Sequence, residues 1–191
     1  TTSASAGMLA DTGKAVNESV ITMNGGGSAG LLGKNNATVT NASPNGVITT
    51  KKEKSAGIYS ENSLPLNEGK ITVEGKESSG IFTKNTDAVS RDVINNGTII
   101  VNGKNSIGMY ASGAGSTATN NNNIVLNADN TTGIYADEGA TAVNTGTITS
   151  SGTHSNVVGV YLGRNSTLNN TGVININGAN GVGVYLKGGT I

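Results

Sequence analysis

Two small groups of charged residues could support acid–base chemistry, because glycosidases and lyases act through carboxylates that converge on one bond. The first group is Asp129, Asp137 and Glu138, with Arg164 about one repeat further along the chain. The second group is Asp87 and Asp92, which flank Arg91. Glycoside hydrolysis needs two carboxyl groups at a defined separation. The other acidic residues are dispersed, so we expect no catalytic residue, and a carbohydrate-active lyase or glycosidase is the minor hypothesis.

Metal, thiol and nucleotide chemistry have little support in this sequence. It contains no cysteine and a single histidine, His154, which we expect to be an exposed turn residue. Residues 25–30 match the G-x-G-x-x-G pattern, but that pattern binds a dinucleotide only between a strand and a helix, and no helix is expected here. We therefore expect no metal and no cofactor.

Aromatic residues that recur at one position of a repeat are the stronger candidates. A phrase of one residue, a glycine, an aliphatic residue and a leucine or aromatic residue occurs eight times. In the last six copies its final position is Tyr59, Phe82, Tyr110, Tyr135, Tyr161 and Tyr185. If this column faces outward, it forms an apolar stripe with hydroxyl groups, suited to stack on sugar rings or on a partner protein. The alternative is a purely structural stack, or one that faces inward.

The spacing of the repeat indicates the fold. The eight glycines are 23, 27, 23, 28, 25, 26 and 24 residues apart, a mean of about 25. A second phrase, typified by Gly97-Thr98-Ile99, and a third, a short strand that ends in asparagine, lie between successive copies. The distance from the second phrase to the next glycine is nearly constant, so we expect insertions in the other part of each coil. Each repeat thus offers three short strands that must stack on their neighbours.

We therefore predict an all-β fold, a right-handed parallel β-helix with three sides, about 25 residues per coil and about seven to eight coils. Residues 1–191 form one segment of it, with almost no helix. A β-sandwich does not explain the steady repeat, and the Leu-x-x-Leu-x-Leu framework of leucine-rich repeats is missing.

Alternation along each strand predicts which side chains face the interior. We expect the aliphatic residue after each repeat glycine, and the residue before that glycine, to face inward. The isoleucine and valine of the second phrase also face inward, while Thr22, Thr49, Thr72 and Thr149 face outward. Two stacked columns follow from the register. The charged column is Asp11, Lys34, Glu61, Lys84, Ser112 and Asp137, and the amide column contains Asn17, Asn67, Asn95, Asn120 and Asn144.

Composition narrows the partners. Twelve basic and twelve acidic residues cancel, which argues against nucleic acid, and no apolar run reaches transmembrane length, so we expect no membrane insertion. The chain begins without Met and ends within a repeat, so we interpret it as a fragment of a longer protein. Open terminal coils would let the isolated fragment self-associate.

Three phrases carry a resemblance to a known family: residues 95–99, residues 102–110 and residues 145–148. They resemble the passenger repeats of type V autotransporter adhesins, above all the large outer-membrane adhesins of fusobacteria, over essentially the whole chain. The resemblance implies display on the bacterial cell surface, with an anchor in the outer membrane through a C-terminal barrel that is not present in this chain. It also implies attachment to a glycan or protein on host cells or other bacteria, and it supplies no catalytic residue.

Overall fold

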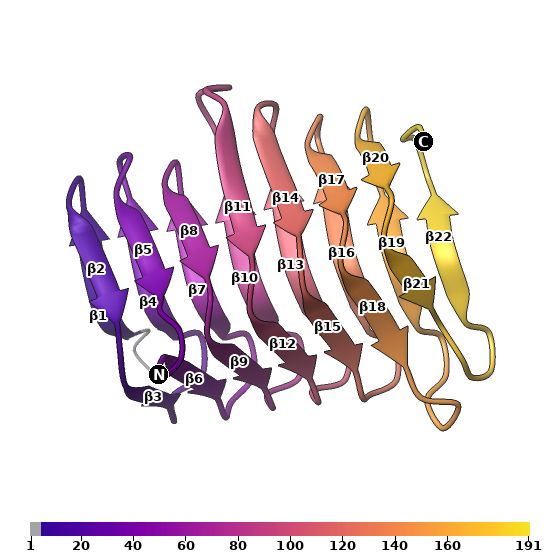
Figure 1. The fold of residues 1–191 in the computed structure, drawn as a ribbon, viewed down its shortest axis with the longest axis horizontal. Coiled ribbons are helices and arrows are strands. Elements are labelled where there is room, and N and C mark those ends of the chain that lie inside the picture. The colour runs from indigo at the N-terminus through magenta and orange to yellow at the C-terminus, as the bar shows by residue number, and fades with distance from the viewer. Residues whose placement is uncertain (1–4) are drawn as a thin grey trace.

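The computed structural model describes residues 5–191, which form a parallel β-solenoid of 22 strands in three sheets (Figure 1). The strands run around the coil in a fixed order, so that every third strand is a neighbour in the same sheet. Seven coils carry all three strands, and β22 begins an eighth. The all-β fold, the three sides and the repeat of about 25 residues are thus confirmed.

Each sheet contains one strand from each coil, and all pairings are parallel. Sheet A contains β1 (Ala6–Asp11), β4 (Ala29–Lys34), β7 (Ala56–Glu61), β10 (Ser79–Lys84), β13 (Ile107–Ser112), β16 (Thr132–Asp137), β19 (Val158–Leu162) and β22 (Val182–Leu186). Sheet B contains β2 (Lys14–Asn17), β5 (Thr38–Asn41), β8 (Leu64–Asn67), β11 (Arg91–Asn95), β14 (Ser116–Asn120), β17 (Thr141–Asn144) and β20 (Thr167–Asn170). Sheet C contains β3 (Val20–Met23), β6 (Val47–Thr50), β9 (Lys70–Val73), β12 (Thr98–Val101), β15 (Asn123–Leu126), β18 (Thr147–Ser150) and β21 (Val173–Asn175).

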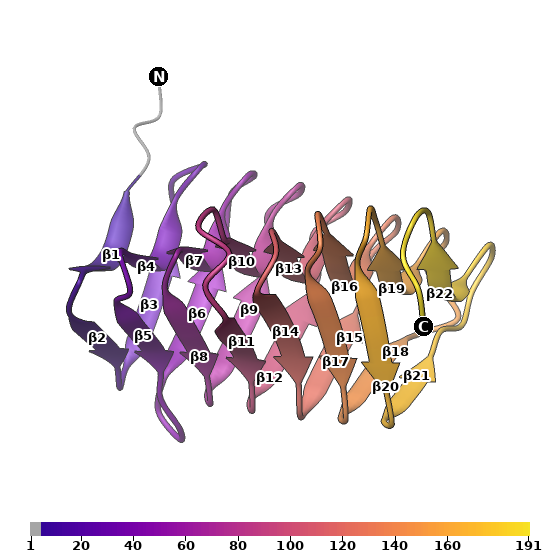
Figure 2. The ribbon, with the colours of Figure 1, turned by 90° about the horizontal axis from the view of Figure 1, so that it is seen from above.

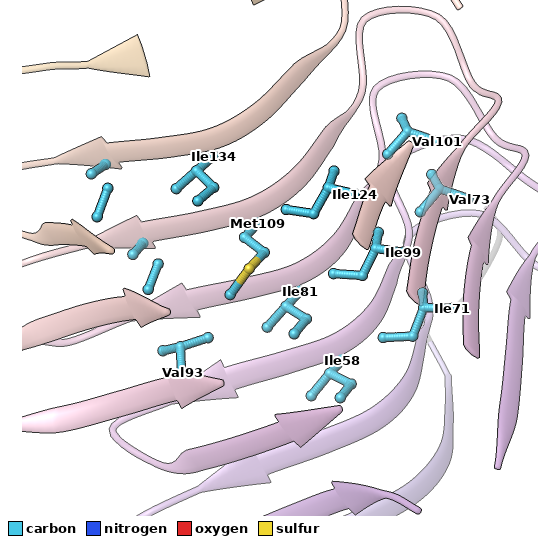
Figure 3. Close-up of a cluster of buried hydrophobic side chains, with 14 of the residues drawn as sticks. Ile58, Ile71, Val73, Ile81, Val93, Ile99, Val101, Met109, Ile124 and Ile134 are labelled. Atoms are coloured by element: carbon cyan, nitrogen blue, oxygen red, sulfur yellow. The ribbon is translucent and has the colours of Figure 1, made fainter. Parts of the chain in front are cut away.

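The interior is a narrow column of aliphatic side chains (Figure 3). The residue after each repeat glycine contributes one face of it, and Ile58, Ile81 and Met109 are fully buried. The second phrase contributes the opposing face, because Ile71 and Ile99 are also fully buried. The four threonines between these residues lie outside and are exposed or half-buried. Both predictions are confirmed, and branched aliphatic residues suit so thin a core because they pack well on pleated surfaces.

The repeat glycine is required by the close approach of neighbouring coils. A Cβ at Gly80 would lie 2.6 Å from the carbonyl oxygen of Gly108 on the next coil and 2.6 Å from Cγ2 of Ile99. Both distances are shorter than real Cβ contacts, so a larger residue would force the coils apart. The ladder pairs Ser79 with Ile107 and Ile81 with Met109 but skips the two glycines. Simple alternation is therefore interrupted at this position.

Insertions fall at two corners, in the variable part of the coil as the sequence predicts. The turn between β10 and β11 is enlarged and projects beyond its neighbours (Figure 1). The connection between β5 and β6 is enlarged at residues 42–46. The first five turns from sheet C to sheet A have the same length, while the turn at residues 151–157 is two residues longer and that at 176–181 is one residue longer. Each of these turns contains at least one residue with positive φ, and in the last four an asparagine takes this conformation: Asn105, Asn130, Asn156 and Asn180. Asparagine suits this position because it tolerates positive φ.

Both predicted columns are in register. In the charged column, equivalent residues of successive coils are register partners in the sheet, for example Lys34 with Glu61 and Glu61 with Lys84. The amide column is longer than predicted, because Asn41 and Asn170 also belong to it. Each asparagine donates its Nδ2–H to Oδ1 of the asparagine on the next coil, at 2.7–2.8 Å.

Candidate functional site

The six aromatic candidates form one continuous ladder on the outer face of sheet A. The register places Phe82 between Tyr59 and Tyr110, and Tyr161 between Tyr135 and Tyr185. Successive ring centroids are 5.2, 4.7, 5.3, 4.3 and 5.3 Å apart. The first five side chains are half-buried, and the last, Tyr185, is exposed, at 45%. The outward orientation that a ligand-binding role requires is therefore present.

The ladder exposes ring edges more than ring faces. Four of the five ring pairs are stacked with interplanar angles of 10–20°, and only Tyr110 and Tyr135 are tilted, at 37°. Each ring from Phe82 to Tyr161 therefore has an aromatic neighbour on both faces. A sugar ring stacks on a free aromatic face. Such a face is restricted to the ends of the ladder, so its length offers C–H edges and phenol hydroxyl groups.

The residue before each repeat glycine also faces outward, and the prediction that it faces inward is wrong. Ala29 and Ala56 are nearly buried, yet they line an outer groove with Tyr59 and do not belong to the core cluster. The interruption at the glycine is the reason. Because of it, the residue before the glycine and the residue two positions after it, such as Ala29 and Leu32, share the outer face. In later coils this column is Ile107, Thr132, Val158 and Val182. The outer face of sheet A thus carries two adjacent, mostly apolar columns.

A groove of about 510 Å³ opens where the aromatic ladder gives way to leucine. Leu9, Leu32 and Tyr59 line it along one column, with the alanines of the second column beside them. Lys34, Lys54 and Glu61 also line it. Burial, and secondarily the charge of Glu61, raises the pKa of Tyr59, so its phenol stays protonated at neutral pH. The groove is thus an apolar depression with charged side chains around it.

The first group of carboxylates does not converge. Asp129 precedes β16 and Asp137 ends it, so roughly 17 Å of extended strand separates them. Oδ1 of Asp137 accepts the backbone N–H of Arg164 at 2.8 Å, and Glu138 pairs with the Arg164 guanidinium at 3.1 Å. Hydrogen bonds to Ser155 and Lys104 lower the pKa of Asp129 to about 2, whereas a general acid at neutral pH needs a raised pKa.

The second group forms a structural clamp. Arg91 is 4% exposed and occupies a corner position that is serine or alanine in the neighbouring coils. Its guanidinium bonds Asp87, Asn85 and, two coils away, Asn36 at 2.6 Å. The pairing lowers the pKa of Asp87 to about 2. Asp92 lies apart on the exposed side of β11. Only the insertion at residues 85–90 hinted at this clamp in the sequence.

The remaining chemical motifs take simple places. His154 lies in the enlarged turn before β19, with 26% of its side chain exposed and its Nδ1 3.9 Å from Asp129. It is therefore less exposed than predicted. Residues 25–28 form a turn, and residues 29–30 are the first two of strand β4. Across residues 5–191 no group of three histidines, cysteines or acidic residues could hold a metal ion. The same residues contain no helix of the length and hydropathy needed to cross a membrane.

Comparison with known families fits this architecture. The profile of the BigA third pectate lyase-like domain, a domain of a bacterial surface protein, matches residues 1–146. The chain belongs to this family. Searches of curated proteins and of solved structures gave no match. The family match and the solenoid together support a parallel β-helix domain of a bacterial surface protein. The pectate lyase-like description concerns the fold and assigns no catalytic residue to this chain.

Proposed function

We propose that this BigA-like segment is part of a cell-surface adhesin that attaches to other bacteria or host cells through the outer face of sheet A. The aromatic ladder is the observation that carries the proposal. It joins the rings of six successive coils into one outward stripe, beside a second apolar column. Exposed apolar stripes of this kind mark interaction surfaces.

Attachment through this face would be multivalent. Eight rungs of sheet A extend over about 34 Å, and each repeats a similar outward pair of positions. Many weak contacts along a rigid surface raise avidity well above the affinity of one contact. The resemblance to autotransporter passengers further suggests an outer-membrane anchor supplied by a part of the protein outside this chain.

Attachment of the fluorescently labelled chain to host cells and to bacteria tests this role. Replacing Tyr110, Tyr135 and Tyr161 with serine should lower attachment at least about tenfold, because the loss of each ring removes apolar area that the partner would cover. Phenylalanine at the same positions keeps the stack and removes only the hydroxyl groups. The matched control replaces Thr117, Thr141 and Thr167 on the outer face of sheet B with alanine. Equal attachment of the wild-type chain, the triple serine variant and the triple phenylalanine variant would indicate that this segment is a passive stalk.

A carbohydrate-active enzyme is the second candidate, favoured by the pectate lyase-like family and by the Asp137, Glu138 and Arg164 cluster. Incubation with a panel of acidic and neutral polysaccharides tests it. Turnover that the Asp137→Asn variant abolishes would support catalysis over adhesion. Turnover that persists in this variant would point to a contaminating enzyme.

A further inference from the structure

The aromatic ladder has one internal end, between Leu32 and Tyr59. Tyr59 stacks on Phe82 with its ring planes 10° apart, and its other face points toward Leu32 of the preceding coil. Leucine covers less of that face than a ring would. The groove described above opens at this junction and extends over Leu32 to Leu9, which is 60% exposed. It is the place on sheet A where an apolar group can enter rather than lie against ring edges.

The lining favours an apolar side chain over a sugar. Two leucines, three alanines and the Tyr59 ring contribute the apolar surface. The Ser28 hydroxyl already bonds the Gly26 carbonyl in its own turn and the Ser5 hydroxyl on the preceding coil. A pyranose ring in this groove would lose water from several hydroxyl groups without matching partners, which costs free energy. An aliphatic or aromatic side chain has no such groups to satisfy.

The charges at the groove favour an acidic neighbour. Lys34 and Lys54 bring two positive charges, against the single negative charge of Glu61. Lys34 lies between Asp11 and Glu61 on the neighbouring rungs, but within residues 5–191 it forms no ion pair with either. The Lys54–Glu77 pair is long, at 3.9 Å, and well exposed. The cations are therefore available to a carboxylate, which also steers the encounter.

We propose that this groove binds an extended protein segment that presents an aliphatic or aromatic side chain and a carboxylate on the same face, two residues apart. This inference rests on the adhesive role proposed above and narrows the partner, at this end of sheet A, to protein rather than glycan. The partner's apolar side chain packs against Leu9, Leu32 and the free face of Tyr59. Its carboxylate lies between the lysines.

Three octapeptides probe the groove against the isotope-labelled chain, followed by backbone amide shifts. In the first, phenylalanine and glutamate alternate along one face of the strand, with serine at every intervening position. The second has lysine in place of glutamate, and the third has serine in place of phenylalanine. We expect the first to shift amides in residues 6–61, and each of the others to bind at least about tenfold more weakly. An absence of shifts there at peptide concentrations of about 2 mM would overturn the proposal, as would stronger binding of the lysine peptide.

A second set of variants locates the binding without unfolding the chain. Leu32→Tyr extends the ladder, fills the groove and covers Tyr59, so the first peptide should lose at least about tenfold in affinity. Lys34→Glu should cost about three- to tenfold. Lys70→Glu makes the same charge change on sheet C, outside the groove, and should leave binding unchanged. Urea unfolding shows whether the Leu32→Tyr chain is folded. If it is folded and binds the first peptide as tightly as the wild-type chain does, the peptide binds outside the groove.

Cell attachment separates this inference from the adhesive role. If the triple serine variant loses attachment and Leu32→Tyr retains it, the adhesive role of sheet A is supported but the groove is not its protein-binding site. If neither variant loses attachment, both proposals fail. Groove shifts caused by a neutral or acidic oligosaccharide at lower concentration than the first peptide would make the partner a glycan and overturn the proposal.

Discussion

Two ladders run along this solenoid with the same spacing but opposite demands. The amide ladder, from Asn17 to Asn170, lies at the corner between sheets B and C, and its central members are fully buried. The aromatic ladder, from Tyr59 to Tyr185, lies on the outer face of sheet A and is half-exposed. Both arise because parallel coils bring equivalent residues together, as Figure 2 shows from above.

The difference lies in what each rung needs from its neighbours. An asparagine amide has a donor and an acceptor that must both be satisfied once water is excluded. One asparagine satisfies the rung on either side, so the identity of the residue is fixed. An aromatic ring has no such requirement, and leucine takes its place in the first two coils. The buried ladder therefore constrains the sequence for stability, while the outer ladder is free to vary in residue type.

The largest expected effect comes from breaking the buried ladder. Asn95→Leu keeps the branched shape of the side chain but leaves Nδ2–H of Asn67 and Oδ1 of Asn120 without partners. Two orphaned buried groups should lower the free energy of unfolding by about 2–4 kcal/mol. Urea unfolding followed by circular dichroism measures this loss. Asn121→Ala removes an exposed amide pair one residue further along the same corner, and it should cost less than about 0.5 kcal/mol. Equal losses would remove the distinction between buried and exposed amides.

Breaking the outer ladder should cost less. Tyr110→Ala removes a half-buried ring and its contacts with Phe82 and Tyr135. We expect a loss of about 1–3 kcal/mol, since half of the ring already faces water. Tyr110→Phe keeps the stack and should change stability by less than about 0.5 kcal/mol. A Tyr110→Ala loss greater than that of Asn95→Leu would reverse the order of the two ladders.

The repeat made most of this structure predictable. Equal spacing placed Tyr110 beside Tyr135, and alternation placed Ile71 and Ile99 in the core, because both follow from parallel stacking alone. Alternation failed at the residue before the repeat glycine, where close approach of the coils interrupts the ladder. The Arg91 clamp to Asn36 could not be predicted, because it depends on how an irregular insertion folds over two coils. The groove was missed for a similar reason, since it needs the outward alanines that alternation had assigned to the interior.

Extending the outer ladder should stabilise the chain. Leu32→Tyr would add a ring on the free face of Tyr59, in register with it. A stacked aromatic pair contributes about 0.5–1.5 kcal/mol beyond the burial of its area, so the free energy of unfolding should rise by about that amount. Leu66→Tyr, at an outward position of β8 without aromatic neighbours, is the matched control and should give a smaller change. Equal effects of the two variants would mean that stacking contributes nothing beyond ring area.

The outer ladder should also lose stability at high pH, an effect that the amide ladder cannot produce. Burial, together with the phenol of Tyr161, raises the pKa of Tyr135 from 10.0 to about 12. The unfolded chain ionises this phenol near pH 10 while the folded chain keeps its proton. The contribution of the Tyr135 phenol to the free energy of unfolding is thus complete below pH 10 and is lost as the pH rises toward 12. Thermal unfolding of the wild-type and Tyr135→Phe chains across this range measures it. The two curves should diverge only above pH 10, whereas parallel curves would show that Tyr135 ionises equally in both states.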